Sequence, residues 1–215
     1  MSAPDGRLDH ETHARLLREK VIPKGGVNET SSQVHPKAVV LAGQPGAGKS
    51  KVSGALLREF DGDVVLVDPD ELRRTHSDFV GLSQKHPYTW AGHTHEDASQ
   101  WAKELRSVAV EGRRNLILDT TLGNGDSAVT LIKDLQAKGY DVEIRGVVAH
   151  RLESELGVDA RFADSLDSAG FGRYVPEEVR KHVYEALPGN LDKVQAETGI
   201  QIRLYGREGT QVYDN

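Results

Sequence analysis

The 215-residue sequence contains no cysteine, which excludes a disulfide framework and thiolate ligands for zinc or iron–sulfur centres. It has no run of about 18 apolar residues and no apolar core of a signal peptide near its N-terminus. It also lacks an excess of basic charge: the net charge is -6, whereas nucleic-acid-binding proteins usually need a basic face. We therefore expect a cytoplasmic protein that binds neither a membrane nor nucleic acid.

A glycine-rich stretch, GQPGAGKS, follows the apolar run 38–42 and fits the phosphate-binding pattern G-x-x-x-x-G-K-[ST]. A helix-like segment at 49–60 comes next, so we expect both the strand before and the helix after that this pattern requires. Lys49 would reach the outer phosphates of a nucleotide, and the Ser50 hydroxyl would ligate Mg²⁺. The stretch predicts a nucleotide site formed by Gly43, Gln44, Pro45, Gly46, Ala47, Gly48, Lys49 and Ser50.

Strand-like and helix-like segments alternate from residue 37 onward, which is typical of a parallel sheet. With the phosphate-binding loop, the alternation predicts an α/β fold, a P-loop NTPase-type parallel sheet with helices on both faces in a single domain. Residues 1–36 are expected to form an N-terminal helix and a polar linker, and residues 37–215 the P-loop domain. The expected strands are 38–42, 63–67, 115–119, 141–148 and 200–205, and the expected helices are 49–60, 95–112, 126–138, 152–168, 176–187 and 190–198.

Acidic residues follow two of these strands, at the sheet edge where ligands of parallel sheets bind. Asp68 and Asp70 follow the strand 63–67, and we favour Asp70 as the group that accepts a proton from a substrate hydroxyl. Either acid could instead cap the next helix or lie in its first turn. Asp119 ends the strand 115–119, where P-loop proteins commonly hold Mg²⁺, although it could also be a turn carboxylate.

Two arginines late in the chain are candidates for stabilising a transferring phosphoryl group. Arg161 lies in an expected helix, and Arg173 lies in the loop 168–175, whose small residues would allow closure over a ligand. Guanidinium groups make bidentate contacts with phosphoryl oxygens. From spacing alone, the favoured interpretation of each arginine is a solvated surface charge.

From about residue 37 to 205 the chain resembles the zeta toxin family, P-loop kinases of bacterial epsilon/zeta toxin–antitoxin systems. The matching segments, in order, are GQPGAGKS, VLVDPDELR, NLILDTTL, KGYDVEI and GRYVP, with Arg161 before the last of them. The resemblance implies ATP-dependent phosphorylation of a sugar hydroxyl on UDP-N-acetylglucosamine, with Mg²⁺. It also implies a small helical epsilon-type antitoxin that blocks the ATP site.

The resemblance implies a role for each matching residue. Asp70 would be the base on the acceptor hydroxyl, Lys49 and Ser50 would hold ATP and Mg²⁺, and Arg161 and Arg173 would clamp the transferring phosphate. The further substrate-side or metal-side residues are Arg73, Asp119 and Thr121.

The chain departs from the family pattern on the helix expected at 95–112. Where family members commonly carry a sugar-binding glutamate, an ungapped register places Lys103, with Glu104 one position along. One residue on a helix turns a side chain by about 100°, so both cannot face the same site. We favour Glu104 as the residue facing the sugar, and a position that commonly holds arginine is Gly123 here.

Two other functions are compatible with the same phosphate-binding residues. One is a small-molecule kinase acting on an antibiotic, a nucleoside or another activated sugar. The other is a nucleotide-dependent switch without an acceptor, which is less favoured because the sequence has no N-K-x-D guanine motif and has a candidate base and two late arginines.

Overall fold

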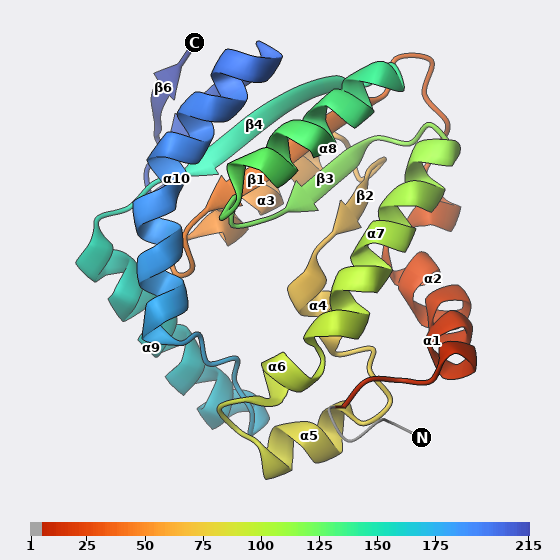
Figure 1. Ribbon diagram of the computed structural model, residues 1–215, viewed down its shortest axis with the longest axis vertical. Helices are drawn as coiled ribbons and strands as arrows, with labels where there is room; N and C mark the ends of the chain where they lie inside the picture. Colours follow the sequence, from red (N-terminus) through yellow and green to blue (C-terminus); the bar gives the residue numbers. More distant parts are fainter. Residues whose placement is uncertain (1–5) are drawn as a thin grey trace.

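The structure, a computed structural model, describes residues 6–215. Within this range six strands form one sheet in the order β2-β3-β1-β4-β5-β6 (Figure 1). Neighbouring strands from β2 to β5 are parallel, and β6 pairs antiparallel with β5. This confirms the predicted α/β fold with a largely parallel sheet. The strands are β1 (Lys37–Gly43), β2 (Val65–Val67), β3 (Leu116–Asp119), β4 (Asp141–Val147), β5 (Gln201–Tyr205) and β6 (Gln211–Asp214).

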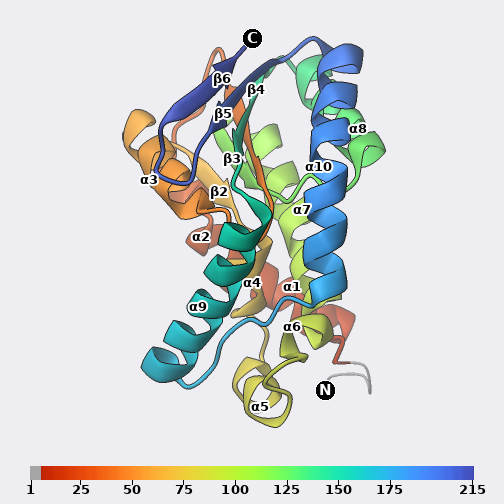
Figure 2. The same cartoon turned by 90° about the vertical axis from the view of Figure 1, so that its left-hand side faces the viewer.

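Helices cover both faces of the sheet, as Figure 2 shows with the sheet nearly edge-on. The helices are α1 (His10–Leu16), the π-helical turn η1 (Leu17–Val21), α2 (Ile22–Lys24), the 3₁₀ turn η2 (Val27–Glu29), α3 (Lys49–Glu59), α4 (Pro69–Arg73), α5 (Phe79–Lys85), α6 (Trp90–His93), α7 (His95–Glu111), α8 (Gly125–Ala137), α9 (Arg151–Ala169) and α10 (Glu177–Thr198).

The central strand β1 is buried on both faces, which explains its unbroken apolar sequence. Ala38 and Val40 belong to a large core under α7, α8 and α10, whereas Val39 and Leu41 belong to a smaller core under α3. Successive side chains on a strand point to opposite faces, so one strand serves both cores. The carboxyl end of β1 is thereby fixed between two packed layers.

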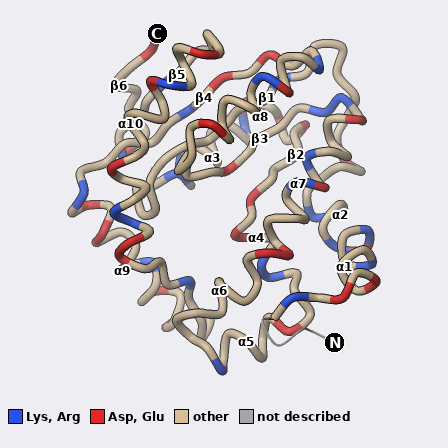
Figure 3. The backbone as a smooth tube through the Cα atoms, in the orientation of Figure 1, with Lys and Arg blue, Asp and Glu red and all other residues tan. Residues whose placement is uncertain are grey.

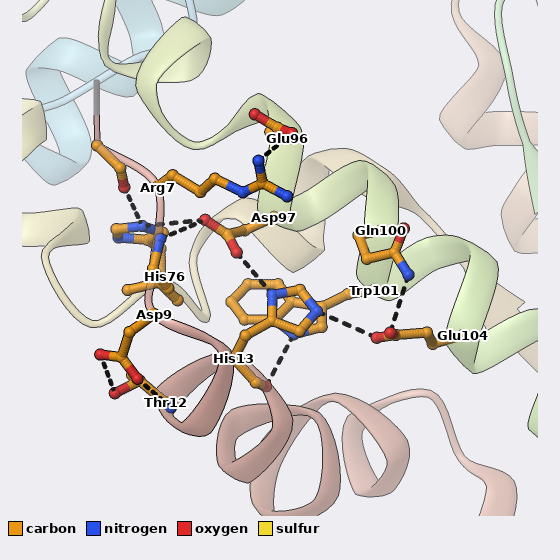
Figure 4. Close-up of polar contacts among 12 residues, drawn as sticks. Arg7, Asp9, Thr12, His13, His76, Glu96, Asp97, Gln100, Trp101 and Glu104 are labelled. Carbon is orange, nitrogen blue, oxygen red and sulfur yellow. Dashed lines mark hydrogen bonds and ion pairs between the residues drawn. The ribbon is translucent and has the colours of Figure 1, made fainter. Parts of the chain in front are cut away.

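The N-terminal segment packs on α7 and belongs to the same core as the sheet. Leu16, Val21 and Val27 are buried in the larger core, and η2 forms inside the stretch expected to be a linker. Polar contacts add to this packing: the buried carboxylate of Asp97 accepts hydrogen bonds from the backbone N–H of Leu8 at 3.0 Å and from the ring of His13 at 2.6 Å (Figure 4). Residues 6–36 are therefore docked on the rest of the fold.

Two elements near the C-terminus differ from the sequence-based expectation. The helices expected at 176–187 and 190–198 are one continuous helix, α10, with Pro188 inside it. Leu187 and Leu191 are buried on either side of the proline, so packing holds the helix together where local propensity would end it. The strand β6 was not expected, because its exposed QVYD sequence carries no buried apolar pattern.

Candidate active site

The loop between β1 and α3 has the shape that its glycines permit. Gly46 and Gly48 have φ angles of 79° and 97°, and Gly48 starts α3. A Cβ atom at Gly46 would lie 2.0 Å from the carbonyl oxygen of Ser154, so α9 packs directly on the loop. Gln44 adds a second connection, since its side-chain amide donates to the carbonyl of Ala149 at 2.7 Å. The N-terminus of α3 is left at the end of a rigidly supported loop, where phosphates bind well.

Lys49 connects this loop to the end of β3. Its ammonium group donates to a carboxylate oxygen of Asp119 and, at 3.0 Å, to the carbonyl of Thr120. β3 is hydrogen-bonded directly to β1, which explains why residues 70 positions apart meet. Ser50 lies one residue further, in the exposed first turn of α3. The structure thus brings Lys49 and Asp119, two of the predicted site residues, into contact.

Asp68 has the structural role that was the alternative for it, because it caps α4. Its carboxylate accepts a hydrogen bond from the backbone N–H of Asp70 at 2.8 Å. Burial raises the pKa of Asp68 to about 6, and the negative charges of Asp119 and Asp70 add to the effect. The three carboxylates therefore lie close enough at this edge of the sheet to repel one another.

Asp70 is surrounded by arginines. Its carboxylate accepts hydrogen bonds from Nη1 of Arg173 and, at 3.4 Å, from Nε of Arg73. Burial raises the pKa of Asp70, but the charges of Arg173, Arg73 and Arg161 outweigh it and hold the pKa below its usual value of 3.8. The structure thus brings Asp70 and Arg173 into contact, and the charge of Arg161 acts on the same carboxylate. Figure 3 shows acidic positions after β2, at the start of α4, and both acidic and basic positions along α9.

Arg73 differs from the other two arginines because it is only 5 % exposed. It donates to the carbonyl of Ala91 and contacts Nδ1 of His95 at 3.0 Å, so it ties α4 to α6 and to the start of α7. Burial lowers the pKa of His95, and the charge of Arg73 lowers it further. Arg73 thus connects Asp70 to α6 and to the start of α7. No pattern in the sequence predicts the contacts of Arg73 with His95 and Ala91.

One cavity, of about 420 Å³, lies at the opposite edge of the sheet, and a larger one, of about 930 Å³, adjoins this site. The larger cavity lies between α7, α8 and α10, and the loop after β3 forms part of its wall. Thr120 and Thr121 line it next to the Lys49 contact, and Lys103 and Arg106 line it from α7. Its volume is in the range of small-molecule sites.

Glu104 does not line this cavity. Its carboxylate contacts Nε2 of His13 at 3.1 Å and accepts a hydrogen bond from Gln100 at 2.9 Å, on the side of α7 that faces α1 (Figure 4). Lys103 thus lines the cavity, whereas Glu104 faces α1, and which of the two faces an acceptor stays a prediction. The physical reason is that two faces of α7 have different neighbours. One face, with Lys103, borders the cavity, and the docked N-terminal segment packs on the face that carries Glu104.

Arg207, in the turn between β5 and β6, is a site residue that the sequence analysis missed. Its guanidinium donates to the carbonyl of Gly46 at 2.7 Å and to that of Glu153 at 2.9 Å, and it thereby joins the phosphate-binding loop to the start of α9. A lone arginine after the last expected strand gives no signal for such a contact. The arrangement as a whole can hold a polyphosphate at the loop, a hydroxyl at Asp70, and developing negative charge between Arg161 and Arg173.

Comparison with known proteins agrees with this geometry. A family model described as "Zeta toxin" matches residues 24–215, nearly the whole chain. The chain belongs to the zeta toxin family. Curated relatives include "Toxin zeta" of Streptococcus pyogenes, 28 % identical over 183 residues, and "Toxin PezT" of Streptococcus pneumoniae, 27 % identical over 187 residues. The matches cover 84 % and 86 % of this chain but 63 % and 74 % of those proteins, so the first relative is considerably longer.

Solved structures share the zeta toxin fold seen here. The structure from the PezAT toxin–antitoxin system of Streptococcus pneumoniae superposes with a TM-score of 0.83 at 22 % identity, over 99 % of this chain and 83 % of that one. A complex of AvrRxo1-ORF1 and AvrRxo1-ORF2 with ATP has a TM-score of 0.61 at 16 % identity, over 98 % of this chain and 66 % of that one. In residues 6–215 of the present protein, no helix combines the length and apolarity needed to cross a membrane.

Proposed function

We propose that this zeta toxin family member is a kinase that transfers the γ-phosphoryl group of ATP to a hydroxyl of a UDP-activated sugar, with UDP-N-acetylglucosamine as the first candidate. The observation that carries the proposal is the Arg173 contact with Asp70, which joins a candidate base to a candidate phosphoryl clamp beside the Lys49 loop. A switch that only hydrolyses nucleotide has no need for this pairing.

The residues divide the reaction between them. ATP binds along Gly43–Ser50 with Lys49 on its outer phosphates, and the incoming phosphates draw Lys49 away from Asp119. The acceptor hydroxyl lies against Asp70, which takes its proton as the oxygen attacks the γ-phosphorus. The bond to the β-phosphate oxygen breaks, ADP leaves with that electron pair, and Arg161 and Arg173 stabilise the charge on the transferring group.

Mg²⁺ fits the same edge of the sheet. Ser50 and Asp119 would hold it, because the carboxylate cluster that raises the pKa of Asp68 favours an added cation. The ion would neutralise phosphate charge during transfer. Hard oxygen donors of this kind are the ligands that Mg²⁺ prefers.

The acceptor, in this proposal, occupies the 930 Å³ cavity. Its acidic lining residues are already paired, Asp126 with Lys193 at 2.5 Å and Asp134 with Lys138 at 2.9 Å. Lys103 and Arg106 remain available for the phosphates of a nucleotide sugar. Thr121 can hydrogen-bond a sugar hydroxyl from the loop after β3.

An antitoxin partner is part of the proposal. The name of the PezAT system describes that relative as one half of a toxin–antitoxin pair. We infer that a small helical protein covers the ATP site of this chain. Such a partner would compete with ATP, so adding ATP should weaken a complex of the two proteins.

The decisive experiment incubates the protein with ATP, Mg²⁺ and a panel of UDP-sugars, and detects products by mass spectrometry. We expect a singly phosphorylated UDP-N-acetylglucosamine, absent with Lys49→Ala although that variant keeps its fold by circular dichroism. ATP hydrolysis without any phosphorylated sugar would refute the sugar-kinase proposal and favour the switch. Phosphorylation of a different small molecule, such as a nucleoside, would favour the other kinase.

A further inference from the structure

Half of the chain's aromatic residues gather at one place, between the α5–α6 region and the loop 170–176 that carries Arg173. We call this group the aromatic clasp, and its members are Phe79, Tyr88, Trp90, Phe162, Phe171 and Tyr174. None of them belongs to either core of the sheet. Their concentration at a single contact between distant segments needs an explanation other than support of the sheet.

The clasp joins two parts of the chain that are distant in sequence, residues 79–90 and residues 162–174. Phe79 packs edge-on against Trp90 at 5.2 Å and against Phe171 at 4.9 Å between ring centroids. Tyr88 contacts Phe162 at 5.6 Å and Tyr174 at 5.7 Å. In Figure 1, α5 and α6 accordingly lie between α9 and the lower end of α7. The rings hold the two sides together beyond the carboxyl edge of the sheet.

One hydrogen bond connects the aromatic clasp directly to the backbone of the loop 170–176. The indole N–H of Trp90 donates to the carbonyl of Gly172 at 2.8 Å, and Trp90 is only 3 % exposed. The next residue is Arg173, whose guanidinium contacts Asp70. Gly172 is also confined on its other side, because a Cβ atom there would lie 2.8 Å from the backbone oxygen and from the ring of Phe162. The backbone position of Arg173 is thus defined from two directions.

We propose that Trp90 is a positioning residue for phosphoryl transfer, which fixes the carbonyl of Gly172 and thereby holds Arg173 on the reacting group. The proposal rests on the kinase function proposed above. Trp90 is buried and is not among the lining residues of the cavity proposed for the acceptor. Loss of Trp90 should therefore weaken stabilisation of the transition state and leave ATP binding unchanged. A misplaced Arg173 guanidinium loses its contact with the phosphoryl charge, while ATP still binds to the Lys49 loop.

The chain supplies a matched control for the test. Trp101, its other tryptophan, is also buried and also donates its indole N–H to a backbone carbonyl, that of His13 at 3.2 Å. Trp90→Phe and Trp101→Phe therefore remove the same ring volume and the same kind of hydrogen bond. Only Trp90→Phe acts on the Arg173 loop. We expect it to lower kcat by roughly threefold to tenfold, the range of one lost hydrogen bond, with unchanged KM for ATP.

A double-mutant cycle separates positioning from general loosening of the fold. Trp90→Phe is measured in the wild type and in an Arg173→Lys background. If Trp90 acts through the Arg173 guanidinium, its cost in kcat largely disappears in that background. An equal cost in both backgrounds would overturn the proposal, as would an equal loss with Trp101→Phe. Gly172→Ala is a second variant for the case that Trp90→Phe folds poorly. Its added methyl group would clash with Phe162 and displace the loop 170–176, so it should reproduce the kcat loss.

Hydrogen exchange gives a readout that does not need the kinase reaction. Amides of 170–176 should exchange faster in Trp90→Phe than in Trp101→Phe or the wild type. Faster exchange in a protein that phosphorylates no acceptor would support the anchoring by Trp90 while refuting the kinase function. Phosphorylation by the wild type with unchanged exchange and unchanged kcat in Trp90→Phe would instead refute the role of Trp90 alone.

Discussion

Asp70 keeps its negative charge against burial because three guanidinium groups surround it. Its pKa lies below 3.8, so the carboxylate is ionised throughout the neutral range, and activity that needs the base is lost only as the pH falls through the lowered pKa. We predict that Arg173→Gln, besides lowering the rate, moves the acid limb of the kcat/KM profile to higher pH. Arg151→Gln, an exposed control at the start of α9 whose partner is Glu155, should leave the limb in place.

The two carboxylates after β2 should differ in their effect on catalysis. Asp70→Asn is expected to keep ATP binding and to cut phosphoryl transfer by roughly 10² to 10⁴, the usual share of a general base. Asp68→Asn should cost less, because an asparagine side-chain oxygen can still accept the hydrogen bond from the backbone N–H of Asp70. Single-turnover rates with ATP affinity measured separately test this. Equal losses at both positions would move the base away from Asp70.

At the scale of elements, the sequence predicts what depends on local pattern. The phosphate-binding loop, its flanking strand and helix, and the acids at the strand ends all follow from spacing and periodicity. The continuity of α10 through Pro188 and the contact of Arg207 with Gly46 depend on tertiary packing, which a linear pattern does not contain. The orientation of Lys103 and Glu104 also depends on tertiary packing, because the N-terminal segment that packs on α7 decides which face of the helix is covered.

The two faces of α7 give a prediction at this scale. Lys103→Gln should raise KM for the UDP-sugar, by roughly threefold to tenfold if one charge-assisted contact to phosphate is lost. Glu104→Gln should leave acceptor kinetics unchanged, because Glu104 contacts His13 outside the cavity. Steady-state kinetics at saturating ATP decide between them. An impaired Glu104→Gln beside a normal Lys103→Gln would restore the assignment favoured from sequence.

At the scale of the whole molecule, the described N-terminal segment packs on α7, the helix that contributes Lys103 and Arg106 to the 930 Å³ cavity. Asp97 is central to this contact: it is 3 % exposed, it binds the N–H of Leu8 and the ring of His13, and His76 lies 3.7 Å from it (Figure 4). Removal of a buried, hydrogen-bonded charge leaves its partners unsatisfied, which is costly. The neighbouring Glu96 makes an exposed pair with Arg7.

These two adjacent acids on α7 therefore form a test of this contact. We predict that Asp97→Ala lowers the free energy of unfolding by about 2–4 kcal/mol, whereas Glu96→Ala changes it by less than about 1 kcal/mol. Urea denaturation followed by circular dichroism measures both. Because His13 ties α1 to Asp97 and the adjoining η1 packs on α7, Asp97→Ala should also speed amide exchange in residues 10–21 under native conditions. Equal stability of the two variants would mean that apolar burial of Leu16 and Val21 alone docks the segment, and that the charged cluster adds nothing to this contact.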